Sequence, residues 1–204
     1  MAIEFRGVKK LVFAPVTTDT AAAYTTGEVE PLAPVAEISK SVETSSEAHY
    51  YDNKAAIVIN TEGSDTVSFT IAVPDPATYA ELTGRTYDST KKMFIESQRV
   101  QKYFAVGYIL GEVGEGDKER FVWRYKGTFN IPEETSATEN DGTDANNLTL
   151  EYTGIYTTHE FANGKGTGTK GSAKAMFMMK ENVSEDDFFS QVVTPDTDTS
   201  AWGD

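Results

Sequence analysis

The 204-residue sequence has no cysteine, only two histidines, and no apolar stretch longer than the eight residues from Tyr103 to Leu110. The absence of cysteine excludes disulfides, thiolate metal sites and a cysteine nucleophile. An apolar stretch of that length is too short to span a bilayer, and the opening residues lack the apolar centre of a signal peptide. We therefore expect a cytosolic protein, or a particle that is assembled in the cytosol.

Basic residues are also scarce, with 18 Lys and Arg against 32 Asp and Glu and a net charge of −14. This balance argues against a conventional nucleic-acid binder, because such proteins neutralise phosphates with clustered Lys and Arg. The segments 133–151 and 181–204 contain six and seven acidic residues and no basic one. We therefore expect the acidity to lie mostly in a loop and a tail, on a body that is nearly neutral.

Strand patterns dominate the rest of the sequence. In the clearest run, 65–73, the apolar residues Val67, Phe69 and Ile71 alternate with small polar ones. The segments 118–129 and 147–156 alternate in the same way. Five further strands are predicted over Val8–Pro15, Val35–Ser45, Lys54–Thr61, Tyr103–Glu112 and Ala173–Lys180. Half-buried strands of this kind predict an all-β fold, a β-sandwich or barrel, with turns at 62–64 and 114–116.

Two short helices are predicted beside these strands. The first has Asp75 as N-cap, Pro76 at its first position and Gly84 past its end, with Tyr79 and Leu82 facing the sheet. The second begins at 184–187 and precedes a pair of phenylalanines. We therefore expect one β domain over 1–183, with long loops at about 41–53 and 132–146. An acidic C-terminal segment with a short helix and an extended tail follows over 184–204.

No catalytic, cofactor or metal site can be assembled from the sequence. Neither His49 nor His159 belongs to a catalytic or metal-binding motif. The motif GxGxxG at 166–171 lacks the preceding strand and following helix of a dinucleotide-binding fingerprint, so a flexible loop is predicted there. The carboxylates of 139–144 lack the ligand order of an EF-hand and predict a solvated turn. The sequence thus predicts a protein that is not an enzyme.

Three stretches, taken in order, carry a family resemblance. The first is FRGVKKLVFAP at 5–15, and the second is VAEIS at 35–39 leading to EAHYYDN at 47–53. The third is the alternating strand 66–73, followed at once by the Pro-capped helix that ends at Gly84. This series resembles the major tail proteins, or tail-tube proteins, of long-tailed bacteriophages of Gram-positive bacteria. The resemblance covers roughly residues 5–180.

The resemblance implies a structural virion protein with a β-sandwich that closes with its neighbours into a hexameric ring. Stacked rings would form the hollow phage tail tube, the conduit for DNA ejection. The implied partners are the protein itself, the tape-measure protein, and the tail terminator and distal tail or baseplate proteins. DNA would be met only in transit, without specific binding, and no membrane is implied. The implied location is the virion, after assembly in the host cytoplasm.

Three assembly surfaces are predicted within this scheme. The first is a long loop over 41–53 that contacts the next ring, because adjacent tyrosines combine apolar area with hydroxyl groups; packing on their own subunit is the alternative. Its contact residues are Tyr50, Tyr51 and Asp52. The second is the basic face of the strand 118–128, which would meet acidic residues of 133–151 or 181–198 in another subunit. Its members are Lys118, Arg120, Arg124 and Lys126, and a solvated outer face is the alternative.

The third predicted surface is the wall of the channel. It is the polar face of the strand 35–45, with Lys40 as the one misfit on the opposite, apolar side. Its members are Glu37, Ser39, Ser41 and Glu43. Hydrated hydroxyls and carboxylates would repel phosphate and let DNA slide. The alternative is the ordinary solvent face of an edge strand.

Two other classes of protein remain open from the sequence. A β-sandwich receptor-binding or adhesin module would use the loop 133–147 as its contact surface, although that loop contains no aromatic residue. A hydrolase of unusual type is the second. Electron micrographs of concentrated protein separate them, since only a tube protein should form rings or tubes.

Overall fold

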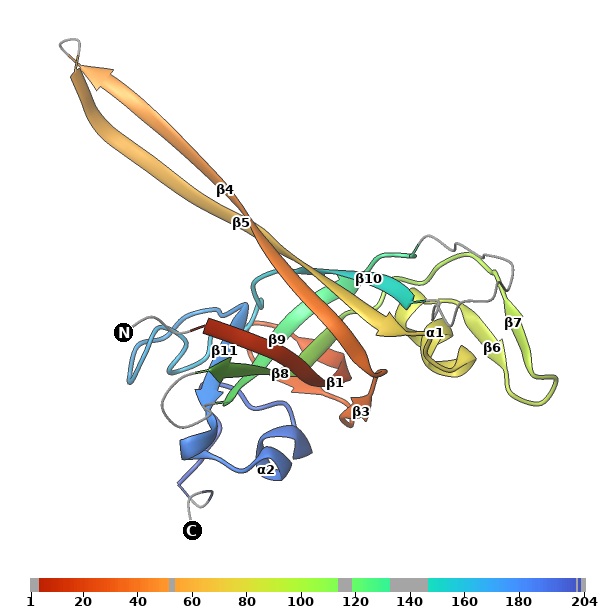
Figure 1. Ribbon diagram of the computed structural model, residues 1–204. Helices are drawn as coiled ribbons and strands as arrows, with labels where there is room; N and C mark the ends of the chain where they lie inside the picture. Colours follow the sequence, from red (N-terminus) through yellow and green to blue (C-terminus); the bar gives the residue numbers. More distant parts are fainter. Residues whose placement is uncertain (1–3, 52–53, 114–118, 133–146, 201, 203–204) are drawn as a thin grey trace.

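The computed structural model describes residues 4–51, 54–113, 119–132, 147–200 and 202, and shows an all-β protein with few helices (Figure 1). The strands are β1 (Glu4–Asp19), β2 (Tyr24–Thr26), β3 (Glu30–Pro31), β4 (Val35–Tyr51), β5 (Lys54–Ala72), β6 (Thr86–Asp88), β7 (Met93–Ile95), β8 (Phe104–Val113), β9 (Glu119–Phe129), β10 (Asn147–Gly154) and β11 (Ala175–Met179). The helices are α1 (Pro76–Thr83), the 3₁₀ turn η1 (Lys180–Asn182) and α2 (Glu185–Ser190). The predicted all-β class is confirmed. The predicted turn at 114–116 and most of the predicted loop 132–146 lie outside the described residues.

One large antiparallel sheet forms the body. Its strand order is β2-β1-β8-β9-β10-β5-β4, with β3 beside β1 and β11 beside β9. On one side of β9, the first half of the strand pairs with β11 and its last three residues pair with β10. The sheet therefore divides into two branches at β9. The sheet also curls, which brings β4 back towards β1. The short strands β2, β3, β6 and β7 carry too few residues for a period of two to be detected, and the sequence did not predict them.

The inner face of the curled sheet encloses the first core. The alternation predicted for 65–73 is confirmed, because Val67, Phe69 and Ile71 are all fully buried in this core. Leu82 of α1 also belongs to it, and Tyr79 packs against it, as predicted. Side chains of β1, β8, β9 and β10 complete the core.

The outer face of β1, β8 and β9 carries a second core, which the C-terminal segment covers. Trp123 of β9 contacts the rings of Phe188 and Phe189, and its indole N–H donates to the backbone oxygen of Phe188 at 3.0 Å. Gly107 on β8 leaves room for this packing, because a Cβ there would come within 2.9 Å of Phe189. The segment 184–193, predicted as part of an acidic C-terminal tail with a short helix, is therefore packed against the body.

Both predicted helices are confirmed, and so are the two caps predicted for the first one. The Asp75 carboxylate accepts hydrogen bonds from the backbone N–H groups of Ala77 and Thr78, and Gly84 ends α1 with a φ of 67°. Ser184 caps α2 by accepting from the N–H of Asp187 at 3.1 Å. Capping groups are local in sequence, which is why both boundaries could be predicted.

The strands β4 and β5 form one continuous hairpin, which projects far from the body as an arm (Figure 1). Pairing runs from Val35 with Ile71 to Tyr51 with Lys54. The prediction of a long loop over 41–53 is therefore wrong, and so is the prediction of a turn at 62–64. Gly63 and Ser64 lie opposite Glu43 in a β-bulge, a position where glycine interrupts a strand without ending it.

Candidate functional site

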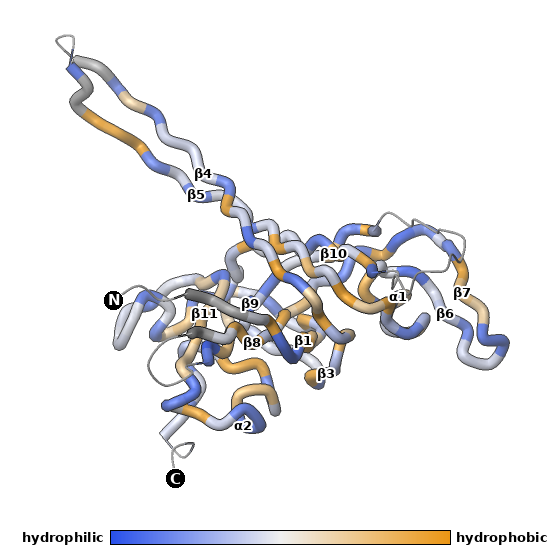
Figure 2. Tube along the Cα trace, viewed as in Figure 1, coloured by the Kyte–Doolittle hydropathy of each residue, from blue (hydrophilic) through white to orange (hydrophobic). Residues whose placement is uncertain are grey.

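The arm exposes apolar side chains on an isolated two-stranded ribbon. We define the arm as residues 44–51 of β4 and 54–62 of β5. Ile57, Val58 and Ile59 follow one another on β5 and are 51%, 56% and 49% exposed. Figure 2 shows this apolar stretch of the arm well away from either core. Exposed apolar residues on a protruding element make the arm the candidate surface for binding another molecule.

The pairing assigns these residues to the two faces of the ribbon. Ile57 lies opposite His49 and Ile59 opposite Glu47, so these four residues share one face. Val58 lies opposite Ala48 on the other face. A two-stranded ribbon is marginal in water on its own. A partner that covers the isoleucine face would therefore stabilise the arm.

A buried ion cluster anchors the base of the arm. The Asp65 side chain, 3% exposed, receives the Arg124 Nη1 at 3.0 Å, the Lys174 Nζ at 2.8 Å and the Lys40 Nζ at 3.2 Å. Lys174 also pairs with Glu62, and the Arg124 Nε donates to the Tyr108 hydroxyl at 3.1 Å. Burial alone would raise the pKa of the Asp65 carboxyl, but hydrogen bonds from Lys174, Arg124 and Lys40 outweigh it and lower the pKa. The cluster thereby joins β4, β5, β9 and the segment before β11.

Two of the predicted basic contact residues already have partners inside the chain. Arg124 is only 4% exposed and pairs with Asp65, while the Lys126 Nζ lies 2.5 Å from the Asp19 carboxylate. The prediction that acids of 133–151 or 181–198 pair with these residues is therefore wrong for both Arg124 and Lys126. The physical reason is that Arg124 faces the inside of the curled sheet, where Asp65 lies, and that β1 brings Asp19 to Lys126.

The other two members of the basic face are placed differently. Arg120 pairs with Leu110 of β8 and with Met179 of β11, and its guanidinium lies 4.4 Å from the centre of the Phe177 ring. Lys118 lies outside the described residues. Of the predicted inter-ring residues, Tyr50 and Tyr51 end β4, and Asp52 lies outside the described residues.

The predicted channel face is present as a polar surface of the edge strand β4. Its members Glu37, Ser39, Ser41 and Glu43 are all exposed. The first three lie opposite Thr70, Ser68 and Thr66 of β5. Ile38 packs against the first core from the other side. Lys40, which interrupted the apolar side of the pattern, points the same way and reaches Asp65.

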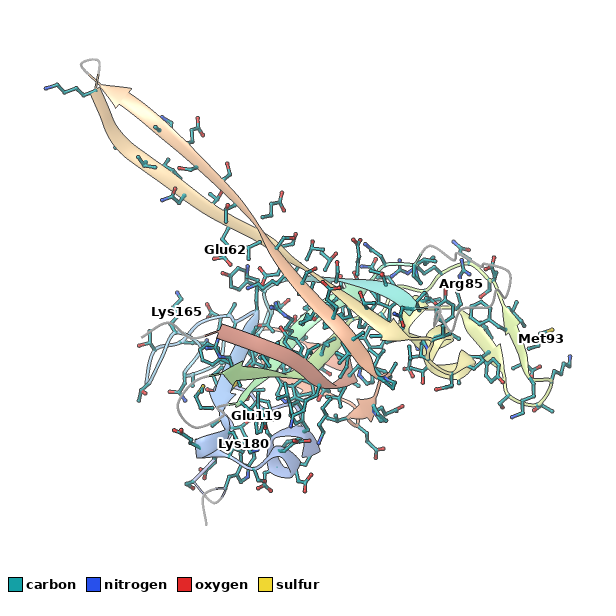
Figure 3. All side chains as sticks on the ribbon, in the orientation of Figure 1. Glu62, Arg85, Met93, Glu119, Lys165 and Lys180 are labelled. Carbon is teal, nitrogen blue, oxygen red and sulfur yellow. The ribbon has the colours of Figure 1, made fainter. Side chains whose placement is uncertain are left out.

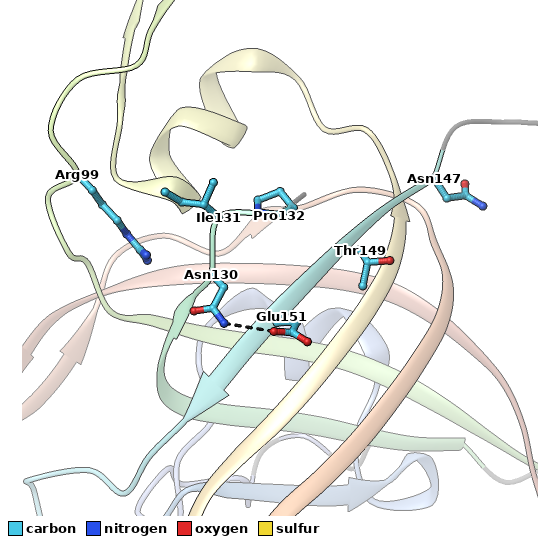
Figure 4. A pocket seen from close by; sticks show the side chains of 7 residues that line it. All are labelled: Arg99, Asn130, Ile131, Pro132, Asn147, Thr149 and Glu151. Carbon is cyan, nitrogen blue, oxygen red and sulfur yellow. Dashed lines mark hydrogen bonds between the residues drawn. The ribbon is translucent and has the colours of Figure 1, made fainter. Parts of the chain in front are cut away.

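An open polar cleft of about 680 Å³ lies where β9 ends and β10 begins (Figure 4). Arg99, Ile131, Asn147 and Glu151 are among its lining residues, and Asn130 donates to Glu151 at 3.3 Å. The described lining residues offer hydrogen-bonding groups, among them the Thr149 hydroxyl and the Glu151 carboxylate.

The remaining motifs have structural surroundings. His159 packs edge-on against Phe161, with ring centres 5.1 Å apart. Residues 166–171 belong to no strand or helix, and Gly166 and Gly168 have positive φ, so the prediction of a loop is confirmed. Within the described ranges, no group of three or more His, Asp or Glu side chains is placed to hold a metal ion. No helix in that part of the chain is long and apolar enough to cross a membrane.

Sequence reasoning missed the two features that define this site. The sequence predicts only a strand over Lys54–Thr61, and the exposure of residues 57–59 depends on the long pairing of β5 with β4, which local patterns do not reveal. Asp65 was counted only as the start of a strand. The one sequence signal near it was Lys40, a single charge on an otherwise apolar face, whose ammonium group reaches Asp65.

No protein-family model matches the chain, and a comparison with curated proteins likewise finds no match.

Proposed function

We propose that this chain is a structural virion protein that assembles into stacked hexameric rings, the tail tube through which a phage ejects its DNA. The observation that carries the proposal is the arm, an apolar ribbon that projects from an all-β body. The number of subunits in a ring comes from the resemblance alone. The protein would be no enzyme, and its partners would be copies of itself, the tape-measure protein, and the terminator and distal tail proteins.

The reach of the arm supports contact between rings. Strands rise about 3.3 Å per residue, so residues 44–51 extend about 25 Å beyond the bulge. A contact at that distance lies outside the subunit's own body. The unpaired edge of β4 would provide a second kind of contact, because an open strand edge can pair with a neighbouring chain.

Replacing Ile57 and Ile59 together by serine should abolish tubes and leave a folded subunit. Burying one isoleucine stabilises a contact by about 1.5–3 kcal/mol, and these two side chains contribute nothing to either core. Electron microscopy and sedimentation measure assembly, and circular dichroism checks the fold. Val73→Ser is the matched control, because Val73 is 65% exposed on the body. Normal tubes from the double variant would contradict the role of the arm.

The polar face of β4 would line the channel. Two carboxylates, Glu37 and Glu43, repeated in six subunits would give roughly twelve negative charges per ring. Replacing both by lysine should permit assembly but slow DNA ejection, because lysines bind phosphate. The matched control is Glu28→Lys with Glu30→Lys, the same charge change at two other exposed glutamates. An unchanged ejection rate in particles carrying the Glu37 and Glu43 changes would exclude this face as the wall.

A receptor-binding module is the second candidate, and the polar cleft beside residues 132 and 147 is the observation that favours it. Such a module would bind its receptor as a discrete particle. Micrographs of the concentrated wild-type protein distinguish the two functions directly. Rings or tubes support the tail-tube proposal, and discrete particles under all conditions contradict it.

A further inference from the structure

A second exposed apolar surface lies on the hairpin of β6 and β7. Phe94 fixes the hairpin to the body, with its ring centre 5.4 Å from that of Tyr79. Its neighbours Met93 and Ile95 therefore point the other way, and they are 43% and 39% exposed. The hairpin thus presents two apolar side chains on a ribbon, as the arm does.

The charge of this region is opposite to that of the protein as a whole. The segment 85–102 contains five basic and two acidic residues: Arg85, Lys91, Lys92, Arg99 and Lys102 against Asp88 and Glu96. Lys91 and Lys92, between β6 and β7, are exposed, and their ammonium groups have no carboxylate partner within the described ranges. Asp88 is already engaged, since its carboxylate accepts from the backbone N–H groups of Thr90 and Lys91. The hairpin therefore combines an apolar face with two cations that have no carboxylate partner among the described residues.

The arm has the complementary composition. Its isoleucine face carries Ile57, Ile59 and His49 together with the carboxylate of Glu47, which is exposed and has no Lys or Arg partner among the described residues. Apolar area on each ribbon would be buried against the other, while the glutamate would lie near the lysines. Opposite charges at the rim of an apolar contact fix its orientation more than they raise its affinity.

The two ribbons lie at opposite ends of the molecule, so one chain cannot bring its own arm onto its own hairpin (Figure 1). Figure 3 labels Met93 on the hairpin and Glu62 near the base of the arm, which points away from it. We propose that the isoleucine face of the arm docks on the β6–β7 hairpin of a second copy of this chain. The two surfaces differ, so the contact is heterologous and repeats from copy to copy along the stack. The inference rests on the proposed function and names the surface that receives the arm.

The lack of cysteine makes this contact directly testable, because an introduced cysteine is the only thiol of its chain. Ile59→Cys and Met93→Cys chains are mixed under assembly conditions and then oxidised mildly. A disulfide-linked heterodimer is expected, at a yield about tenfold above two controls. One control pairs Met93→Cys with Val58→Cys, on the reverse face of the arm. The other pairs Ile59→Cys with Phe177→Cys, at a site that is 57% exposed elsewhere.

Charge exchange gives a second readout that needs no oxidation. Glu47→Lys should raise the concentration needed for assembly about tenfold. Adding Lys91→Glu and Lys92→Glu to the same chain should restore assembly at the wild-type concentration, since each arm would again meet opposite charge.

Tubes that form while the Ile59–Met93 crosslink stays at control level would overturn this inference alone. Linked Ile59→Cys homodimers would replace it with a two-fold contact between arms. A wild-type protein that never self-associates would overturn the proposed function and this inference together.

Discussion

Asp65→Asn is expected to lower the free energy of unfolding by about 3–5 kcal/mol, although asparagine has nearly the same shape. The change leaves the Arg124 and Lys174 side chains, 4% and 7% exposed, without their shared counter-charge. Lys174 keeps its contact with Glu62, but Arg124 keeps only the Tyr108 hydroxyl, and a buried cation without a carboxylate cannot recover the hydration that it lost on folding. The effect should therefore far exceed that of removing an exposed ion pair, which is worth about 0–1 kcal/mol.

Denaturant unfolding measures this difference, provided that the slope of the transition stays unchanged. Asp186→Asn is the matched control, because Asp186 is exposed in α2. The control should change stability by less than about 0.5 kcal/mol. A loss below about 1 kcal/mol for Asp65→Asn would show that the cluster does not hold the base of the arm.

The contribution of Asp65 should also depend on pH in one direction. Its carboxyl pKa is lower in the folded protein than the ordinary value, which the unfolded chain has. The stabilisation is therefore complete above the ordinary pKa of aspartate and is lost as the pH falls through the folded pKa. The gap in stability between wild type and Asp65→Asn should narrow in that acidic range. Asp19 acts in the same direction, because Lys126 and two backbone N–H groups outweigh its burial and lower its pKa.

The local features of the fold could be predicted, because each depends on neighbours in sequence. Asp75 and Gly84 bound α1 through their own side-chain and backbone geometry, and the alternation of 65–73 determines which face is buried. The continuity of the arm could not be predicted in this way. Gly63 has the sequence signature of a turn, and only pairing with Glu43 on the opposite strand makes it a bulge.

The partners of Arg124 and Lys126 could not be predicted from local sequence either. A period of two correctly separates Arg124 from Trp123, but it does not say which side faces solvent. In β9 both faces are buried, because the first core lies on one side and the C-terminal segment on the other. The carboxylates that neutralise Arg124 and Lys126 come from β5 and β1, distant in sequence. Such pairings depend on the whole topology.

Phe188→Ala is expected to lower the free energy of unfolding by about 3–5 kcal/mol, an effect as large as that of Asp65→Asn. Phe188 is fully buried and packs against Phe121 and Trp123 on the outer face of the sheet. Truncation would leave a cavity next to the indole. The hydrogen bond from the Trp123 indole to the Phe188 backbone oxygen would remain, but it does not replace the lost packing.

Gln191→Ala is the control for this prediction, because Gln191 is exposed in the same segment. It should leave stability within about 0.5 kcal/mol of wild type. Tryptophan fluorescence during denaturant unfolding follows Trp123 itself, together with Trp202, which packs against the same core. An appended tail would unfold before the sheet, so Phe188→Ala would then cost little in the main transition. A single shifted transition is expected instead, since the segment 184–193 and the three central strands share one core.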